Sequence, residues 1–272
     1  MTRTDLHIGV LFPMDTVRHS LGQFARMWGR AVANHDFLQA VAASNLYGQL
    51  TVFVPTEVDC AHLSSTLLAG HGDDIFIVAY KDIAGHLQAH PVDVLHVPDP
   101  NLFAGTHIRN FFSERDFVVT GITHSLGNQH FLAWALQNDA NGVRAQDCLF
   151  CTTPTAREVV ESMFDSLRRS APDFAAPQCR VLPLGITPPT SVPSREIARR
   201  SLEIDDDECV ILSLCRFDHQ FKMDLLPLLH VYSSVCASSD RQMRLILGGA
   251  SGDGAYVDYV RQFVTQQSLQ NV

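Results

Sequence analysis

Residues 208–224 read ECVILSLCRFDHQFKMD, and this stretch determines the fold expected for the whole chain. Its apolar run Cys209–Leu214 has the length of a buried strand and leads directly into a polar turn that carries Arg216 and Lys222. Apolar residues resume near Met223, where a helix is expected to begin. The first backbone N–H groups of a helix have no partner within it, so a strand, a basic turn and a helix in this order form a layout suited to phosphate groups.

Further apolar runs of strand length lie along the chain, separated by segments long enough for helices. Strands and helices that alternate in this way predict an α/β fold with a parallel sheet covered on both faces. In such sheets ligands bind at the carboxyl ends of the strands, which draws attention to Asp99 and to residues 120–127. The expected strands are residues 7–12, 50–54, 75–79, 92–97, 117–119, 147–152, 180–184, 209–214 and 244–247.

Helical spacing of apolar residues predicts the connections between these strands. After the first strand a helix is expected over residues 24–32, and Asn34 and His35 are expected to separate it from a second short helix at residues 37–43. The other expected helices are residues 129–137, a longer one that starts at Pro154, and residues 197–202, 225–235 and 256–264.

A proline-rich segment divides the chain into two expected domains. Residues 183–193 contain four prolines and no apolar run that a core would need, so the linker is placed at residues 187–195. Residues 1–186 then form an N-terminal α/β domain, and residues 196–272 form a second one with only two strand–helix units. Because so small a sheet leaves one edge unpaired, the second domain is expected to be incomplete, and that edge is the expected contact of any homo-oligomer.

The composition is that of an ordinary globular protein, and it restricts the expected partners. Of 272 residues, 46% are hydrophobic and 18% are charged, and the net charge of −9 at pH 7 disfavours nucleic acid. No apolar run approaches the roughly 18 residues of a membrane span and no signal peptide is evident, so a cytoplasmic protein is expected. Seven cysteines, an odd number, favour reduced thiols. Cys148 and Cys151 are expected in the core, and residues 205–207 in a solvated turn, so no metal is expected.

The loop TGITHSLG at residues 120–127 contains the candidate catalytic histidine, His124, between Thr123 and Ser125. A histidine at the end of a strand can exchange a hydrogen bond with a substrate hydroxyl, although a loop histidine that caps its neighbour has the same appearance. Only Gly22 follows the first strand, where a nicotinamide-binding fold would need G-x-G-x-x-G, so no such cofactor is expected.

In this order the motifs resemble the retaining glycosyltransferases of the GT-B fold, of the family-4 type. The resemblance implies two Rossmann-like domains, with a nucleotide-diphosphate sugar bound mostly by the second and an acceptor mostly by the first. It also implies transfer with retention and no metal or cofactor. The motifs are VVTGITHSLG (118–127), DCLFCTTPTAREVV (147–160), RVLPLGI (180–186), VILSLCRFDHQFKMDLLPLL (210–229) and LILGGASGDG (245–254).

The resemblance also assigns roles to residues that match the family's motifs. Arg216 and Lys222 match the cations that contact the donor diphosphate, and His124 matches the histidine beside the transferred sugar. Two glycine-containing loops match those that approach the donor or its sugar: Ser20, Leu21 and Gly22 after the first strand, and Gly248 and Gly249 after the last.

The sequence departs from the family's pattern at three points. Cys215 stands where a glycine is usual, the spacing from Arg216 to Lys222 is one residue longer than the commonest form, and no two glutamates lie eight positions apart. Such a glutamate pair holds the sugar and ribose in the family, so a chain truncated within its donor domain is expected. Two alternatives stay open, a non-catalytic binding or assembly module and a phosphorylase of the same fold.

Overall fold

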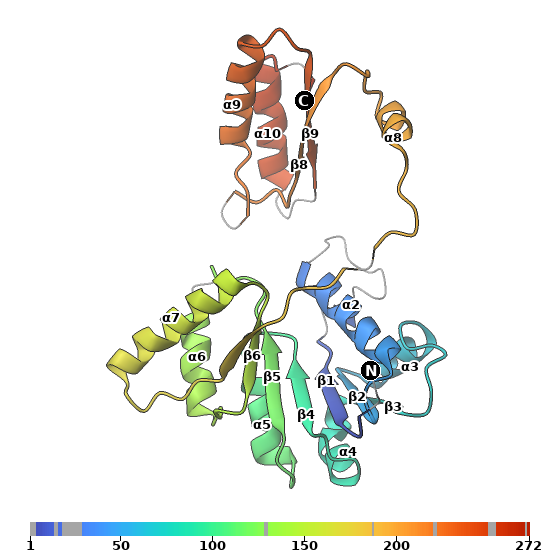
Figure 1. Cartoon of the computed structure of the whole chain (residues 1–272), viewed down its shortest axis with the longest axis vertical. Coiled ribbons are helices and arrows are strands. Elements are labelled where there is room, and N and C mark those ends of the chain that lie inside the picture. The colour runs from blue at the N-terminus through green and yellow to red at the C-terminus, as the bar shows by residue number, and fades with distance from the viewer. Residues whose placement is uncertain are drawn as a thin grey trace. The chain divides into compact units, whose positions relative to one another are not determined.

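The computed structural model shows two compact units, one before and one after residue 187, each with a sheet of its own (Figure 1). Among the described residues no helix is long and apolar enough to cross a membrane. The structure describes residues 4–13, 16–17, 29–127, 130–186, 188–219, 222–249, 254–269 and 271–272.

The first unit is built on a seven-stranded parallel sheet in the order β3-β2-β1-β4-β5-β6-β7 (Figure 1). The chain runs outward from β1 to β3 and then returns to β4, so the strand order reverses between β1 and β4. Open parallel sheets bind ligands in the crevice at this reversal. The strands are β1 (His7–Leu11), β2 (Gln49–Val54), β3 (Ile75–Ala79), β4 (Val94–Val97), β5 (Val118–Ile122), β6 (Cys148–Cys151) and β7 (Gln178–Val181).

Helices cover both faces of this sheet because neighbouring residues of a strand point to opposite sides. Val10 belongs to a core cluster with Leu38 of α2 and Leu63 of α3. The next residue, Leu11, belongs to another cluster with Leu87 of α4. The helical elements are α2 (Gly29–Ser44), α3 (Glu57–Ser65), the 3₁₀ turn η1 (Tyr80–Asp82), α4 (Ile83–Ala89), α5 (Phe103–Phe112), α6 (Phe131–Ala140) and α7 (Pro154–Ser170).

Helix α2 is continuous, and the predicted interruption at Asn34 and His35 is wrong. Asn34 is buried, and its amide Nδ2 donates to Thr16 Oγ1 at 3.4 Å and to the Pro98 carbonyl at 3.5 Å. These partners lie on the loops after β1 and β4, so long-range contacts satisfy a residue that local preference would place at a helix end. Residues 24–28 of the first predicted helix lie outside the described residues.

Two strands of the first unit, β5 and β7, differ most from the predicted ranges. β5 continues to Ile122 because Gly121 and Ile122 still pair with β6, so His124 lies two residues beyond the strand. β7 ends at Val181, before Pro183, whose ring nitrogen cannot donate to a ladder.

A buried ion pair fixes the start of β5. The Arg109 guanidinium donates to both carboxylate oxygens of Asp147, at 2.7 and 3.0 Å, and the two side chains are 1% and 0% exposed. Arg109 also donates to the carbonyls of Phe117 and Gly142, while Asp147 accepts from the Val119 N–H. These bonds join α5 to β5 and to the loop before β6.

The second unit has a parallel pair of strands, β8 and β9, in register from Cys209 beside Met243 to Leu214 beside Gly248. One face of the pair packs on two helices, where Leu245 lies in a core cluster with Leu229 and Val260. The helix predicted to begin near Met223 begins at Leu226, whose N–H is capped by Asp224 Oδ1 at 3.1 Å. The elements are α8 (Arg195–Ser201), β8 (Cys209–Leu214), α9 (Leu226–Ala237), β9 (Met243–Gly248) and α10 (Gly254–Gln266).

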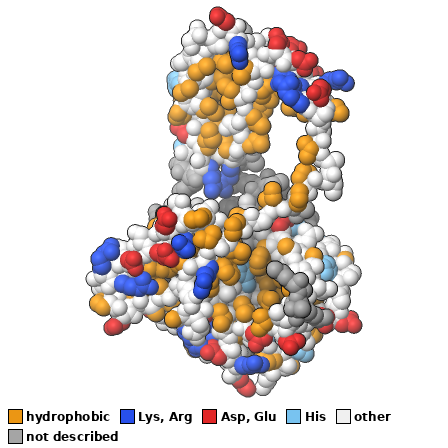
Figure 2. Space-filling view, viewed as in Figure 1, with side chains coloured by type: hydrophobic (Ala, Val, Ile, Leu, Met, Phe, Trp, Pro, Cys, Tyr) orange, Lys and Arg blue, Asp and Glu red, His pale blue; other side chains and the backbone are white. Residues whose placement is uncertain are grey.

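The other face and one edge of this small sheet are partly open. Leu212 and Leu214 of β8 are 57% and 73% exposed, and hydrophobic side chains gather on the surface of the second unit (Figure 2). At the edge of β9, the Leu245 N–H donates to the Asn271 carbonyl at 2.8 Å. Part of the apolar surface of this sheet, and part of its strand edge, therefore lies outside the core of the second unit.

Candidate functional site

The predicted basic turn follows β8 directly and closes on itself. The Cys215 N–H donates to the Gly248 carbonyl at 3.0 Å, which holds the start of the turn against the end of β9. The Asp218 carbonyl accepts from the N–H groups of Lys222 and Met223, both at 2.9 Å. This closure brings Arg216 and Lys222 onto one loop at the carboxyl end of the sheet.

The two cations of this turn have different surroundings. Arg216 is half-buried, and its Nη2 lies 3.3 Å from Asp218 Oδ2, whereas Lys222 is exposed. A carboxylate beside Arg216 orients its guanidinium, while the ammonium of Lys222 faces solvent. Asp218 was not predicted as a site residue, although the sequence places it two residues after Arg216, a candidate phosphate ligand.

The predicted glycines at the end of β9 lie beside this turn. Gly248 is paired with Leu214, the last residue of β8, so both strand ends meet at one place. A Cβ atom at Gly249 would lie 1.7 Å from the Cys215 carbonyl oxygen, which no side chain can tolerate. Gly249 therefore permits close approach of two backbones where the turn begins, and the structure brings Gly248 and Gly249 together with Arg216.

In the first unit, His124 lies at the carboxyl ends of β4 and β5. Its Nε2 lies 3.4 Å from the Pro98 carbonyl, which is also the acceptor for Asn34. Because a carbonyl only accepts, this contact assigns the proton to Nε2 and leaves Nδ1 as the acceptor nitrogen of the neutral ring. The side chain is half-buried, so the ring is oriented and still accessible.

An ion pair beside His124 was only partly expected from the sequence. Asp99 follows β4, as the rule for strand ends suggested, and its Oδ2 accepts from Arg30 Nη1 of α2 at 2.7 Å. The other carboxylate oxygen accepts from the Asn101 N–H at 2.9 Å. Arg30 had no signal in the sequence, because only the fold brings α2 to the end of β4.

Below this edge, His96 of β4 is buried among apolar neighbours. Burial, with a smaller contribution from the nearby His124, lowers its pKa from 6.5 to about 4. Its Nδ1 lies 3.0 Å from Thr120 Oγ1. At neutral pH His96 is therefore uncharged and adds no positive charge beside His124.

Three predicted site residues, Ser20, Leu21 and Gly22, lie outside the described residues. In the described part of the chain, no group of three or more histidine, cysteine or acidic side chains is arranged to hold a metal ion.

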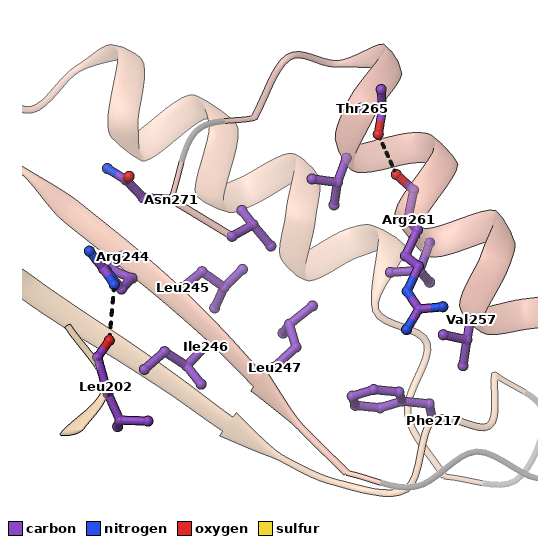
Figure 3. Close-up of a pocket in the computed structure, with 13 residues that line it drawn as sticks. Leu202, Phe217, Arg244, Leu245, Ile246, Leu247, Val257, Arg261, Thr265 and Asn271 are labelled. Carbon is purple, nitrogen blue, oxygen red and sulfur yellow. Dashed lines mark hydrogen bonds between the residues drawn. The ribbon is translucent and has the colours of Figure 1, made fainter. Parts of the chain in front are cut away.

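The second unit also contains a cavity of about 850 Å³ between β9 and α10 (Figure 3). Its lining is mainly apolar, as Leu245, Leu247 and Val257 illustrate, and of the basic turn it includes only Phe217. Its two arginines already have carboxylate neighbours, Glu208 at 3.1 Å for Arg244 and Asp258 at 3.5 Å for Arg261. The cavity is thus distinct in chemistry from the cationic turn.

Comparison with protein-family models and with curated proteins gives no match. Among solved structures, HepE of Anabaena in complex with UDP matches 98% of this chain and 67% of its own, with a TM-score of 0.57 and 13% sequence identity. The chain shares the fold of HepE. The complex of HepE with UDP-glucose matches the same shares of both chains at 13% identity, with a TM-score of 0.54. This likeness confirms the predicted α/β fold of the GT-B type, and at such low identity it shows the fold alone.

Proposed function

We propose that this protein is a glycosyltransferase that uses a nucleotide-diphosphate sugar as donor. The observation that carries the proposal is the turn after β8, which presents Arg216 and Lys222 on one loop at the carboxyl end of the sheet. HepE, which shares the fold, was solved with UDP and with UDP-glucose, and this supports a uridine nucleotide as the first donor to test.

In the proposed reaction the bond between the anomeric carbon and the diphosphate breaks, and a bond to the acceptor oxygen forms. Negative charge develops on the departing nucleoside diphosphate, and two fixed cations stabilise it without a metal or cofactor. The proton of the acceptor hydroxyl leaves with the diphosphate or to solvent. We assign binding of the diphosphate to Arg216 and Lys222. We assign backbone contacts with the diphosphate to Gly248 and Gly249.

We assign His124 to the transferred sugar, and Ser20, Leu21 and Gly22 to the donor phosphate or the sugar. An imidazole ring can exchange a hydrogen bond with a sugar hydroxyl. Retention of configuration and membership of the family-4 type belong to the proposal. So does a cytoplasmic location, which the seven free thiols favour.

Calorimetric titration of the chain with UDP and UDP-glucose tests the proposal, together with an assay for UDP release with and without simple sugars as acceptors. We expect saturable binding of UDP, and release of UDP from UDP-glucose. A donor panel in which no nucleotide or nucleotide sugar binds would overturn the proposal. Cleavage of a disaccharide that requires inorganic phosphate would identify a phosphorylase of the same fold instead.

A binding or assembly module is the second candidate, and the open face of the small sheet favours it. Leu212 and Leu214 are more than half exposed, and at the edge of β9 the Leu245 N–H donates to the Asn271 carbonyl. Such a surface suits another protein or a second copy of the chain. Sedimentation analysis separates the cases, because a concentration-independent monomer that binds UDP contradicts the module.

A further inference from the structure

Tyr256 of α10 contacts both limbs of the basic turn. Its hydroxyl accepts a hydrogen bond from the Leu225 N–H at 2.6 Å and donates to Asp224 Oδ1 at 3.0 Å. Its ring packs against the ring of His219, with centroids 5.0 Å apart. Asp224 and Leu225 lie on the limb that leads from Lys222 into α9, and His219 lies on the limb that follows Arg216.

The contacts of Tyr256 are buried, which makes the loss of its hydrogen bond to Leu225 costly. Tyr256 is 7% exposed and Leu225 is fully buried, so removal of the hydroxyl takes the acceptor from a buried N–H group. An unpaired buried N–H group is costly. The Leu225 N–H therefore either keeps its bond to the Tyr256 hydroxyl or moves outward, with its limb of the turn, to reach water. The same burial raises the pKa of the Tyr256 hydroxyl, which therefore keeps its proton for Asp224 at neutral pH.

Tyr256 also links the turn to the other strand end. It stands in the first turn of α10, the helix that follows β9 and its terminal glycines. Gly249 already holds the start of the turn through its approach to the Cys215 carbonyl. The start of the turn is thus fixed by the end of β9, and its return limb is fixed by α10.

We propose that Tyr256 is a positioning residue that holds the limb carrying Lys222, and through His219 the limb carrying Arg216, in the arrangement that binds the donor diphosphate. This inference rests on the proposed function. Without the hydroxyl the turn samples other positions, and the apparent affinity for the diphosphate falls in proportion to the fraction of molecules in which the two cations are aligned.

The test uses Tyr256→Phe, which keeps the ring on His219 and removes only the hydroxyl. The matched control is Tyr259→Phe on the same helix, where the side chain is 52% exposed. UDP affinity is measured by calorimetry well below the unfolding temperature of each variant. We expect Tyr256→Phe to bind UDP about 2- to 12-fold more weakly, the range that one hydrogen bond provides, and Tyr259→Phe to match the wild type.

A double-mutant cycle with Lys222→Ala separates positioning from a merely structural role. If Tyr256 acts through the cation, Tyr256→Phe costs less affinity in the Lys222→Ala background than alone. A lower unfolding temperature with unchanged UDP affinity, or losses that simply add, would overturn the inference. If Tyr256→Phe does not fold, Asp224→Ala, which removes the exposed acceptor of the hydroxyl, is put through the same cycle and judged by the same outcomes.

The outcomes also separate this inference from the proposed function. A wild-type chain that fails to bind UDP overturns both. A wild-type chain that binds UDP and is weakened by Lys222→Ala, while Tyr256→Phe leaves affinity unchanged, overturns the positioning role alone.

Discussion

Arg216 and Lys222 lie on the same turn but have different surroundings. The guanidinium of Arg216 donates to Asp218. A phosphate that binds there either replaces Asp218 as the acceptor or shares the guanidinium with it. Lys222 is exposed, so its side chain is accessible to a ligand. The sequence was sufficient to place both cations on one turn, because strand, turn and helix are contiguous. It could not reveal Tyr256, which lies 31 positions beyond Leu225 and joins them only through the fold.

Replacement of either cation tests the site at this scale. We expect Arg216→Ala and Lys222→Ala each to lower turnover of a nucleotide-sugar donor by about 10²- to 10³-fold, because each removes charge that stabilises the departing diphosphate. Steady-state kinetics measure the loss, and circular dichroism checks that the fold is kept. Turnover at the wild-type rate in both variants would remove these residues from the site.

Among the elements, helix α2 and strand β5 show where local patterns are insufficient. Asn34 and His35 resemble a helix break, yet the Pro98 carbonyl, 64 positions away, satisfies Asn34 inside a continuous helix. Strand β5 gains Gly121 and Ile122 from pairing with β6. Strands with unbroken apolar runs, such as Ile75–Ala79 and Cys209–Leu214, were predicted at their observed bounds. Periodicity thus located the elements, while long-range hydrogen bonds decided where several of them begin and end.

The ion pair of Arg109 and Asp147 gives a prediction for how elements are joined. We expect Arg109→Ala to lower the free energy of unfolding by about 3–5 kcal/mol, since it leaves a fully buried carboxylate without its cation. Arg168→Ala is the control, because its pair with Asp165 is exposed and worth at most about 1 kcal/mol. Denaturant titration measures both changes, and equal small effects would show that the buried pair contributes no more than a surface one.

A chain of side chains at the amino ends of β1 and β2 makes stability depend on pH. His7 Nδ1 donates to the Pro91 carbonyl at 3.0 Å, so its Nε2 accepts from the Thr51 hydroxyl at 2.7 Å. The same hydroxyl accepts from His86 Nε2 at 3.1 Å. This sequence of bonds requires a neutral His7, because its Nε2 must accept a hydrogen bond. Burial lowers the pKa of His7, while its bond to the Pro91 carbonyl and the nearby Asp93 oppose this shift. Burial, together with His90, which is stacked on His86, lowers the pKa of His86 from 6.5 to about 4.

Because the folded state binds these protons less readily than the unfolded state, stability is full above about pH 6.5 and falls as the pH decreases towards 4. We expect His86→Gln, whose amide can still donate to Thr51, to flatten this part of the stability profile. His71→Gln, at an exposed histidine, is expected to leave the profile unchanged. Urea denaturation between pH 4 and 7 measures the slopes, and parallel slopes for wild type and His86→Gln would contradict the assignment.

At the scale of the whole molecule, the two units have separate cores and are joined by one exposed stretch. Residues 188–193 are exposed, and α8 begins only after Ser194, whose hydroxyl caps it. The linker predicted at residues 187–195 rested on prolines, which the sequence displays directly. The carboxyl edge of the sheet in the first unit was harder to predict, because Arg30, Asn34 and Asp99 meet only when β1 and β4 become neighbours.

Limited proteolysis tests the division of the chain. We expect early cleavage within residues 188–193 by a protease of broad specificity, and a resistant fragment that contains the seven-stranded sheet. Mass spectrometry of the products locates the cut. First cleavage within the first unit's sheet would contradict the expected linker.

The contact at Gly249 restricts which sequences can carry this site. Any side chain there would collide with the Cys215 carbonyl, so a change at position 249 displaces the residue immediately before Arg216. In a saturation library selected for donor binding, position 249 is expected to return glycine alone, whereas exposed Lys222 would tolerate arginine. Homologues that use a different donor are therefore expected to differ in the side chains of the turn. They are expected to keep glycine at position 249, where the backbone passes close to the Cys215 carbonyl.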